Sequence, residues 1–200
     1  MAAPAAKRDL TSLPASRTEL VAFDISPFPY RGAVPGSGRP FLDITEGERR
    51  GHYSARFGGS ARNAFASAPV VIAAYSGGYY PAAFILQHGR ADERLRGVIL
   101  LDALYGDHEK FAEWLTRYPS AFFVSAFGKS AREDNEKLQR MLKERGLHFQ
   151  RTLPRTLARG SVTFIAADDE VKHEDFVTEA WVKHPLRAVL RRIPGFSRKK

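Results

Sequence analysis

The sequence predicts an α/β fold built on a parallel β-sheet, and three observations support this class. From about residue 69 of the 200-residue chain, four short apolar segments alternate with stretches of helical periodicity. The segments are hydrophobic at successive positions, which is typical of strands buried on both faces. Glycine, proline and small polar residues separate them from the helices. Strands that alternate with helices form βαβ units with right-handed crossovers.

The first strand of this series is predicted at residues 69–75, a β-branched run that ends at Ser76-Gly77-Gly78. A helix over residues 79–88 follows, with apolar side chains for packing and Gly89 as its end. The pattern then continues with a strand, a helix and a strand at residues 97–101, 107–117 and 121–127.

The C-terminal part of the pattern begins with a helix over residues 130–145. Ser130 is expected to cap this helix and Gly146 to end it. A strand at residues 161–167 leads to a last helix, which starts near Glu174 and is broken near Pro185.

The N-terminal third of the chain is less regular. Residues 19–25 could form one more strand, and seven prolines and glycines between residues 27 and 40 predict a long loop. Residues 55–67 could form a helix, which the pair Gly58-Gly59 weakens.

Length and charge fit one globular domain over residues 17–190, between a disordered leader (1–16) and a basic flexible tail (191–200). The net charge is +9, but seven of the 31 basic residues, and no acid, lie between Lys183 and Lys200. The rest of the chain is therefore close to neutral. This argues against a nucleic-acid-binding face.

Other compositional features exclude several kinds of site. The chain has no cysteine, so disulfides, thiolate metal sites and cysteine nucleophiles are absent. No apolar run approaches the 18 or so residues of a membrane span, and the leader lacks the apolar core of a signal peptide. We expect a cytoplasmic protein as the sequence stands, with export if the true N-terminus lies upstream. The oligomeric state is not predicted.

Ser76 carries the strongest chemical signal. It stands between a buried strand and a helix in Ala74-Tyr75-Ser76-Gly77-Gly78, a small-x-Ser-x-Gly pattern. Small residues two positions before and after the serine allow a sharp turn that presents the hydroxyl, as in a nucleophile elbow. The N–H of Gly77 would then stabilise an oxyanion. The alternative is a glycine-rich turn that binds phosphate or nothing.

A serine nucleophile needs an acid and a base, and both have candidates in the expected chain order. Asp102 ends the next strand after four apolar residues, where a carboxylate is costly without a partner. The alternative is a loop or helix cap, but Asp107 suits that role better. Glu133 and Asp134 are rival acids, although their place in a first helical turn already explains them.

His173 is the candidate base because it follows the last strand closely, after the acidic loop residues 168–170. Those acids and His173 also suggest a divalent metal site, but three adjacent acids on one loop seldom converge on one ion. We therefore predict no metal and no cofactor. The other five histidines lie in less suitable places: His52, His88, His108, His148 and His184.

The segments Ala74–Tyr79 and Leu100–Gly106, together with the late His173, resemble the α/β-hydrolase superfamily over residues 69–182. They are most similar to a bacterial branch with an SGGY elbow and an LLDALYG motif. The resemblance implies an esterase, lipase or amidase with a parallel-sheet, three-layer sandwich. In that role Ser76 is the nucleophile, His173 the general base and acid, and Asp102 the orienting carboxylate.

One feature departs from the superfamily. Only one predicted strand precedes the strand that leads into Ser76, and the His-Gly type loop that completes the oxyanion hole is missing. The N-terminal half is therefore reduced, either because the gene start is misplaced or because the form is degenerate and inactive. In the latter case the chain would be a non-catalytic module that binds a ligand or partner. A nucleotide cradle is a third reading, but the three-glycine fingerprint is absent.

The substrate expected from this reading is a small-molecule ester or amide. Aromatic residues close to the predicted triad could line an apolar substrate pocket or serve only in packing: Tyr75, Tyr79, Tyr80, Tyr105 and, on the following helix, Trp114.

Overall fold

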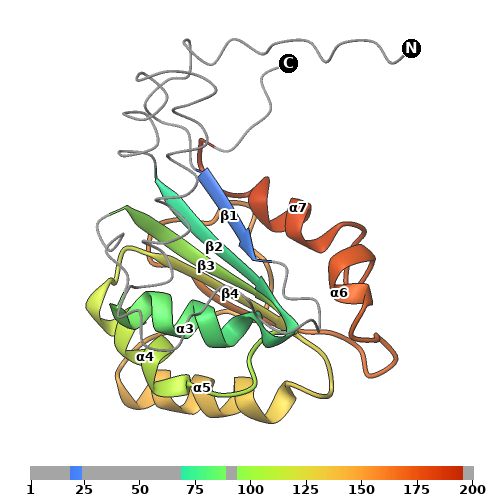
Figure 1. Cartoon of the computed structure of the whole chain (residues 1–200), viewed down its shortest axis with the longest axis horizontal. Coiled ribbons are helices and arrows are strands. Elements are labelled where there is room, and N and C mark those ends of the chain that lie inside the picture. The colour runs from blue at the N-terminus through green and yellow to red at the C-terminus, as the bar shows by residue number, and fades with distance from the viewer. Residues whose placement is uncertain (1–18, 24–68, 89–93, 196–200) are drawn as a thin grey trace, which may run out of the picture.

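The computed structural model of this chain describes residues 69–88 and 94–195, together with the backbone of residues 19–23. Its centre is an all-parallel sheet in which five strands follow one another in chain order (Figure 1). The predicted α/β fold with a parallel sheet is therefore confirmed. The strands are β1 (Glu19–Phe23), β2 (Val70–Tyr75), β3 (Leu95–Leu101), β4 (Phe122–Phe127) and β5 (Val162–Ala166).

Helices connect the last four strands and continue after β5. A short 3-10 turn, η1, precedes the first described helix, and the last two helices both follow β5. The elements are η1 (Ser76–Gly78), α3 (Tyr79–His88), α4 (His108–Arg117), α5 (Arg132–Glu144), α6 (Asp175–Thr178) and α7 (Pro185–Leu190).

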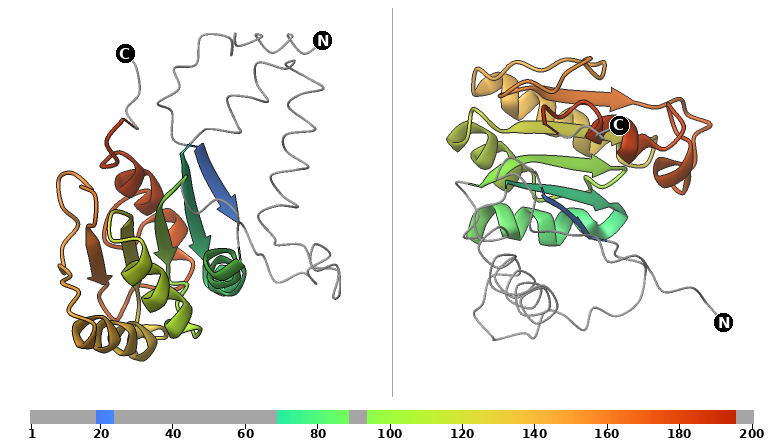
Figure 2. Two further views of the ribbon diagram at one scale, coloured as in Figure 1. Left: turned by 90° about the vertical axis from the view of Figure 1, so that its left-hand side faces the viewer. Right: turned by 90° about the horizontal axis from the view of Figure 1, so that it is seen from above.

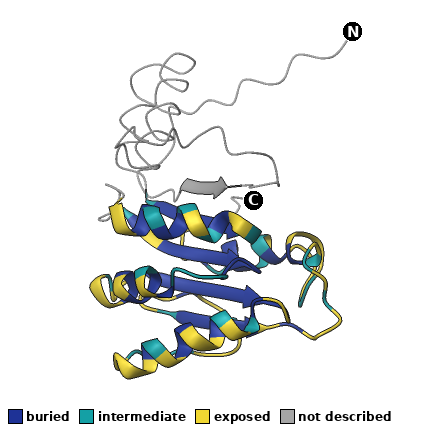
Figure 3. Ribbon diagram, turned by 60° about the horizontal axis from the view of Figure 1, so that its bottom comes forward, coloured by how far each residue is buried: buried dark blue, intermediate teal, exposed yellow. Residues whose placement is uncertain are grey.

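Side chains of β2 to β5 alternate between two cores, one on each face of the sheet. Ile72, Leu100 and Phe123 pack against the buried sides of α3, α4 and α5. Ile99 and Val124 belong to the opposite core, with side chains of α6 and α7. Figures 2 and 3 show the resulting arrangement, with buried strands inside and helices whose outer sides are exposed. Burial on both faces explains why the strands lack a polar alternation.

The end of the chain differs from the predicted helix that begins near Glu174 and breaks near Pro185. Two short helices are present, because α6 ends at Thr178 and its carbonyl accepts a hydrogen bond from the His184 N–H. Pro185 opens α7 and does not interrupt a helix. The reason is that a proline at the first helical position lacks only an N–H that would be unpaired there anyway.

The predicted domain ends at residue 190, but the packed part of the structure extends further. Packing continues beyond residue 190, since Ile193 is buried and the Arg192 carbonyl accepts a hydrogen bond from the Leu157 N–H. The expected strand at 19–25 is present as β1, which pairs with β2. Three other expectations lie outside the described residues: the leader, the loop around residues 27–40 and the helix at 55–67.

The predicted candidate catalytic residues all follow the carboxyl ends of strands. These ends all lie on one edge of the sheet, since every strand pair is parallel. None of the helices in the described ranges is long and apolar enough to cross a membrane.

Candidate active site

Ser76 and Asp102 occupy equivalent positions on neighbouring strands. Tyr75, the last residue of β2, pairs with Leu101, the last residue of β3. The next residue on each strand is therefore Ser76 and Asp102, at the carboxyl edge of the sheet. Both have left-handed backbones, with φ of 55° and 43°. Such angles are uncommon for residues other than glycine and cluster at functional sites.

The left-handed turn at Ser76 follows from its neighbours in sequence. The extended backbone of Tyr75 gives way at Ser76 to the 3-10 turn η1, which continues into α3. Ala74 and Gly78, two positions before and after the serine, are both buried, so larger side chains would disturb the close approach of strand and helix. The half-buried Ser76 is thus presented at the point where the chain reverses, and the Gly77 N–H lies at the start of the helical segment.

Asp102 is almost completely buried, with 1% of its surface exposed, and several donors surround its carboxylate. The Gly128 N–H donates to Oδ1 at 2.9 Å. The Tyr105 hydroxyl donates to Oδ2 at 3.0 Å, and the Ser130 hydroxyl lies 3.3 Å from the same oxygen. These contacts explain how a carboxylate can end a strand in the core, because a buried charge is tolerated only when it is paired and hydrogen-bonded.

His173 completes this cluster from the opposite end of the described chain. Its Nδ1 lies 2.6 Å from Oδ2 of Asp102. A carboxylate oxygen only accepts hydrogen bonds, so Nδ1 is the donor in this contact, and in the neutral ring the lone pair is then on Nε2. The His173 side chain is 38% exposed, so the imidazole is accessible while its orientation is fixed.

Several contacts hold the segment that carries His173. The ring of Tyr75 stacks on the imidazole, with centroids 4.6 Å apart and planes 23° apart. Asp169, four residues earlier, accepts a 2.6 Å hydrogen bond from Arg132 at the start of α5. Phe176, three residues later, is fully buried against the opposite core. Contacts of residues before and after His173 therefore hold its backbone in place, and Tyr75 covers one face of its ring.

The structure brings Asp102 and His173 together, and it places Ser76 directly after the tyrosine that stacks on His173. Among the described residues the Ser76 hydroxyl forms no hydrogen bond to His173. Nucleophile and base are often separated in this way before a substrate binds, when catalytic contacts are long or poorly aligned.

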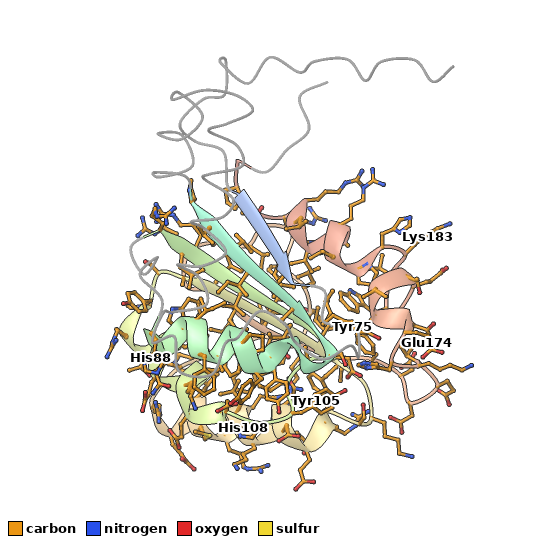
Figure 4. All side chains as sticks on the ribbon, viewed as in Figure 1. Tyr75, His88, Tyr105, His108, Glu174 and Lys183 are labelled. Atoms are coloured by element: carbon orange, nitrogen blue, oxygen red, sulfur yellow. The ribbon has the colours of Figure 1, made fainter. Side chains whose placement is uncertain are left out.

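The four predicted tyrosines are linked to one another and to His173 through ring contacts, whereas the predicted Trp114 is not part of this group. Tyr79 contacts Tyr105 edge to face with centroids 6.0 Å apart, and Tyr80 is 56% exposed. Trp114, on the buried side of α4, belongs to the core on that face of the sheet. Figure 4 shows Tyr75 and Tyr105 near the carboxyl ends of the strands, whereas His88 lies at the far end of α3.

The side-chain pKa is raised in two of these tyrosines. Burial raises the pKa of Tyr105 to about 12, and the nearby charge of Asp102 acts in the same direction. The pKa of Tyr79 is also raised, first by burial and then by the charges of Asp107 and Asp134. Both hydroxyls therefore keep their protons at neutral pH and remain hydrogen-bond donors.

The rival candidates have other partners or lie elsewhere. Asp134 is 2.8 Å from His108, a contact that links α5 to α4, and Glu133 is exposed on α5. His148 and His184 are exposed outside the cluster, and His52 is outside the described residues. In the described ranges no group of three histidine, aspartate or glutamate side chains could hold a metal ion.

Sequence reasoning missed the donors that bind Asp102. Ser130 was expected to cap α5, but the N-cap position is Ala131, without a side-chain cap, and the Ser130 hydroxyl faces Asp102 and Tyr105 instead. The signal available was Phe127-Gly128-Lys129-Ser130 at the end of the adjacent strand. That segment contains no acid, but a glycine N–H and a hydroxyl there can serve an acid on the neighbouring strand.

Comparison with known proteins gave no significant match to a family model, a curated protein or a solved structure.

Proposed function

We propose that this protein is a serine hydrolase that cleaves a carboxylic ester or amide through an acyl-enzyme. One observation carries the proposal: the Asp102–His173 hydrogen bond lies beside a serine held in a left-handed strand-to-helix turn. In serine hydrolases such a pair supplies a correctly oriented imidazole, and such a turn presents the nucleophile.

In the first half of the proposed reaction, Ser76 Oγ attacks the carbonyl carbon of the substrate and its proton passes to Nε2 of His173. The Asp102 carboxylate stabilises the imidazolium through Nδ1–H and keeps its own charge. The negative charge on the former carbonyl oxygen is stabilised by the Gly77 N–H. When the tetrahedral intermediate collapses, the bond to the leaving group breaks, and the alcohol or amine takes the proton from Nε2.

In the second half, water attacks the carbonyl carbon of the acyl-Ser76 ester while Nε2 of His173 accepts one of its protons. Collapse of this second intermediate breaks the bond to Oγ, which regains the proton from His173. The carboxylic acid leaves and the free enzyme returns. No cofactor is needed for either half.

The fold proposed with this function is an α/β-hydrolase-like three-layer sandwich. The helices on both faces of the sheet and the chain order Ser76, Asp102, His173 support it. Asp102 follows the strand adjacent to the elbow, one strand earlier than in most of the superfamily. If Gly77 were the sole oxyanion donor, the rate would be lower by about 100- to 1,000-fold.

A second candidate is a catalytically inactive α/β-hydrolase-like module with a binding role. The specific observation in its favour is that the Ser76 hydroxyl forms no hydrogen bond to His173 among the described residues. In this case the crevice at the carboxyl ends of the strands would bind a ligand without turning it over.

Turnover of small activated esters distinguishes the two candidates. We expect the wild-type protein to hydrolyse p-nitrophenyl acetate with an initial burst, and intact-protein mass spectrometry to detect an acylated form. Ser76→Ala should lose both the burst and the acylated species. Ser120→Ala, which removes the hydroxyl of an exposed serine before β4, serves as the matched control and should retain them. Equal turnover by Ser76→Ala and the wild type would contradict the hydrolase.

A further inference from the structure

We propose that Tyr105 is a positioning residue that shares Oδ2 of Asp102 with His173 and thereby sets the pH range in which His173 acts as a base. The inference rests on the proposed hydrolase function, but it concerns the Asp102–His173 pair and can be tested without turnover.

The first step is the crowding of one carboxylate oxygen. Oδ2 of Asp102 has His173 Nδ1 at 2.6 Å, the Tyr105 hydroxyl at 3.0 Å and the Ser130 hydroxyl at 3.3 Å. Oδ1, by contrast, has the Gly128 N–H at 2.9 Å. A carboxylate oxygen offers about two lone-pair sites, so the donors on Oδ2 compete.

The second step is the allocation of protons. Ser130 and Tyr105 each have one hydroxyl proton, and their oxygens are 3.3 Å apart. Every group is satisfied when Ser130 donates to the Tyr105 oxygen, Tyr105 donates to Oδ2, and Nδ1–H donates to the same Oδ2. The raised pKa of Tyr105, caused chiefly by burial, keeps this proton in place well above neutral pH. Tyr105 is therefore the permanent competitor of the imidazole.

The third step is the consequence for His173. A hydrogen bond from Tyr105 withdraws electron density from Oδ2, so the carboxylate stabilises an imidazolium less than it would alone. The neutral imidazole, which is the form that accepts the serine proton, then persists to lower pH. Removing the Tyr105 hydroxyl leaves only Ser130 to compete for Oδ2, at the longer distance of 3.3 Å. The Nδ1–H···Oδ2 bond should therefore strengthen, and base function should move to higher pH.

The other charged or titratable groups around the pair do not change in such a variant. Tyr75 stacks on His173 from β2, and Arg132 on α5 is paired with Asp169. Lys129 lies between Gly128 and Ser130, the two residues that contact Asp102. The charged residues within five positions of His173 in the sequence are Asp168, Asp169, Glu170, Lys172, Glu174 and Asp175.

The experiment compares Tyr105→Phe, which keeps the ring, with Tyr79→Phe, which removes a hydroxyl from the ring that packs on Tyr105. The first readout is the far-downfield proton resonance of the Nδ1–H···Oδ2 bond in the one-dimensional NMR spectrum, assigned by its loss in His173→Gln. We expect Tyr105→Phe to move this resonance further downfield, Ser130→Ala to move it less, and Tyr79→Phe to leave it in place.

The second readout is the pH dependence of fluorophosphonate labelling of Ser76. In Tyr105→Phe the pH of half-maximal labelling rate should rise by about one unit, because a hydrogen bond to a charged group is of that order. An unchanged or upfield-moving resonance in Tyr105→Phe would overturn the inference. If the resonance moves as expected but Ser76 is never labelled, the role of Tyr105 stands and the hydrolase function fails.

Discussion

The imidazole Nδ1 of His173 lies 2.6 Å from Oδ2 of Asp102, although 71 residues separate the two in the sequence. The contact joins the end of β3 to the loop between β5 and α6 across the carboxyl edge of the sheet. Since Asp102 is buried and His173 is partly exposed, the pair has a fixed inner end and an accessible outer end. This is the arrangement that a general base requires.

Replacement of Asp102 by asparagine tests the role of the carboxylate. The amide oxygen can still accept the hydrogen bond from Gly128, so the fold should persist. The amide nitrogen would instead donate to Nδ1, which forces the proton onto Nε2 and abolishes its lone pair. We expect the fluorophosphonate labelling rate of Ser76 to fall by about 10⁴-fold. The matched control Asp168→Asn changes an exposed acid and should label at the wild-type rate; a normal rate for Asp102→Asn would contradict this role.

The stability of the fold should fall at alkaline pH partly because of Tyr105. Its pKa is raised from 10.0 to about 12 in the folded state, chiefly by burial. A raised pKa contributes stability that is fully present below the unfolded value and is lost as pH rises through the folded value. We therefore expect Tyr105→Phe to lose less stability than the wild type between pH 10 and pH 12.

This difference can be measured as the change in urea midpoint across that pH range. Tyr80→Phe removes the hydroxyl of an exposed tyrosine and provides the comparison. Parallel losses in the wild type and Tyr105→Phe would show that the Tyr105 proton does not contribute to alkaline unfolding.

Gly97 is required by the packing of β3 against β4. It pairs in register with Phe122, and a Cβ at Gly97 would lie 2.5 Å from three ring atoms of that phenylalanine. Gly97→Ala should destabilise the protein by about 1–3 kcal/mol through overpacking. Gly77→Ala is the matched control, since nothing lies within 4 Å of a Cβ there. Thermal unfolding measures both; equal melting temperatures would argue against the close Gly97–Phe122 contact.

A buried polar contact fixes the start of α5 on β4. The Ser125 hydroxyl donates to Asn135 Oδ1 at 2.6 Å, and Asn135 Nδ2 donates to the Ala131 carbonyl at 2.7 Å. Ser125→Ala leaves the Asn135 oxygen buried without this donor, which should cost about 1–3 kcal/mol.

The matched control for this prediction is Thr116→Ala, which removes from an exposed residue a hydroxyl that donates to a carbonyl of its own helix. Its effect on the free energy of unfolding should stay within about 0.5 kcal/mol. Denaturant titration of both variants decides the question, and a Ser125→Ala loss as small as that of Thr116→Ala would contradict it.

Much of the fold could be predicted from sequence because its signals are local. Buried parallel strands are apolar along their whole length, so β2 to β5 stand out between their helices. The start of β3 was placed two residues late, since the exposed Arg96 interrupts the apolar run after Leu95. The two helices after β5 were merged because the chain reversal at residues 179–184 has no glycine to mark it.

Proximity of the site residues was predictable for a topological reason. Parallel strands bring residues at their carboxyl ends to one edge, which placed Asp102 beside Ser76 and led to the expectation that His173 would lie nearby. The partners of Asp102 were not predictable in the same way. The Gly128 N–H and the Ser130 hydroxyl reach Asp102 only because the end of β4 lies beside the end of β3. Neither a glycine nor a serine indicates this role by its residue type.

The most direct test of the central claim is fluorophosphonate labelling followed by peptide mass spectrometry. We predict one adduct on Ser76 in the wild-type protein and in the control Ser120→Ala, which changes an exposed serine, and none in His173→Ala, which removes the imidazole that accepts the serine proton. Circular dichroism of each variant confirms that the fold persists. An unlabelled Ser76 in folded wild-type protein, or undiminished labelling in His173→Ala, would contradict an activated serine at this site.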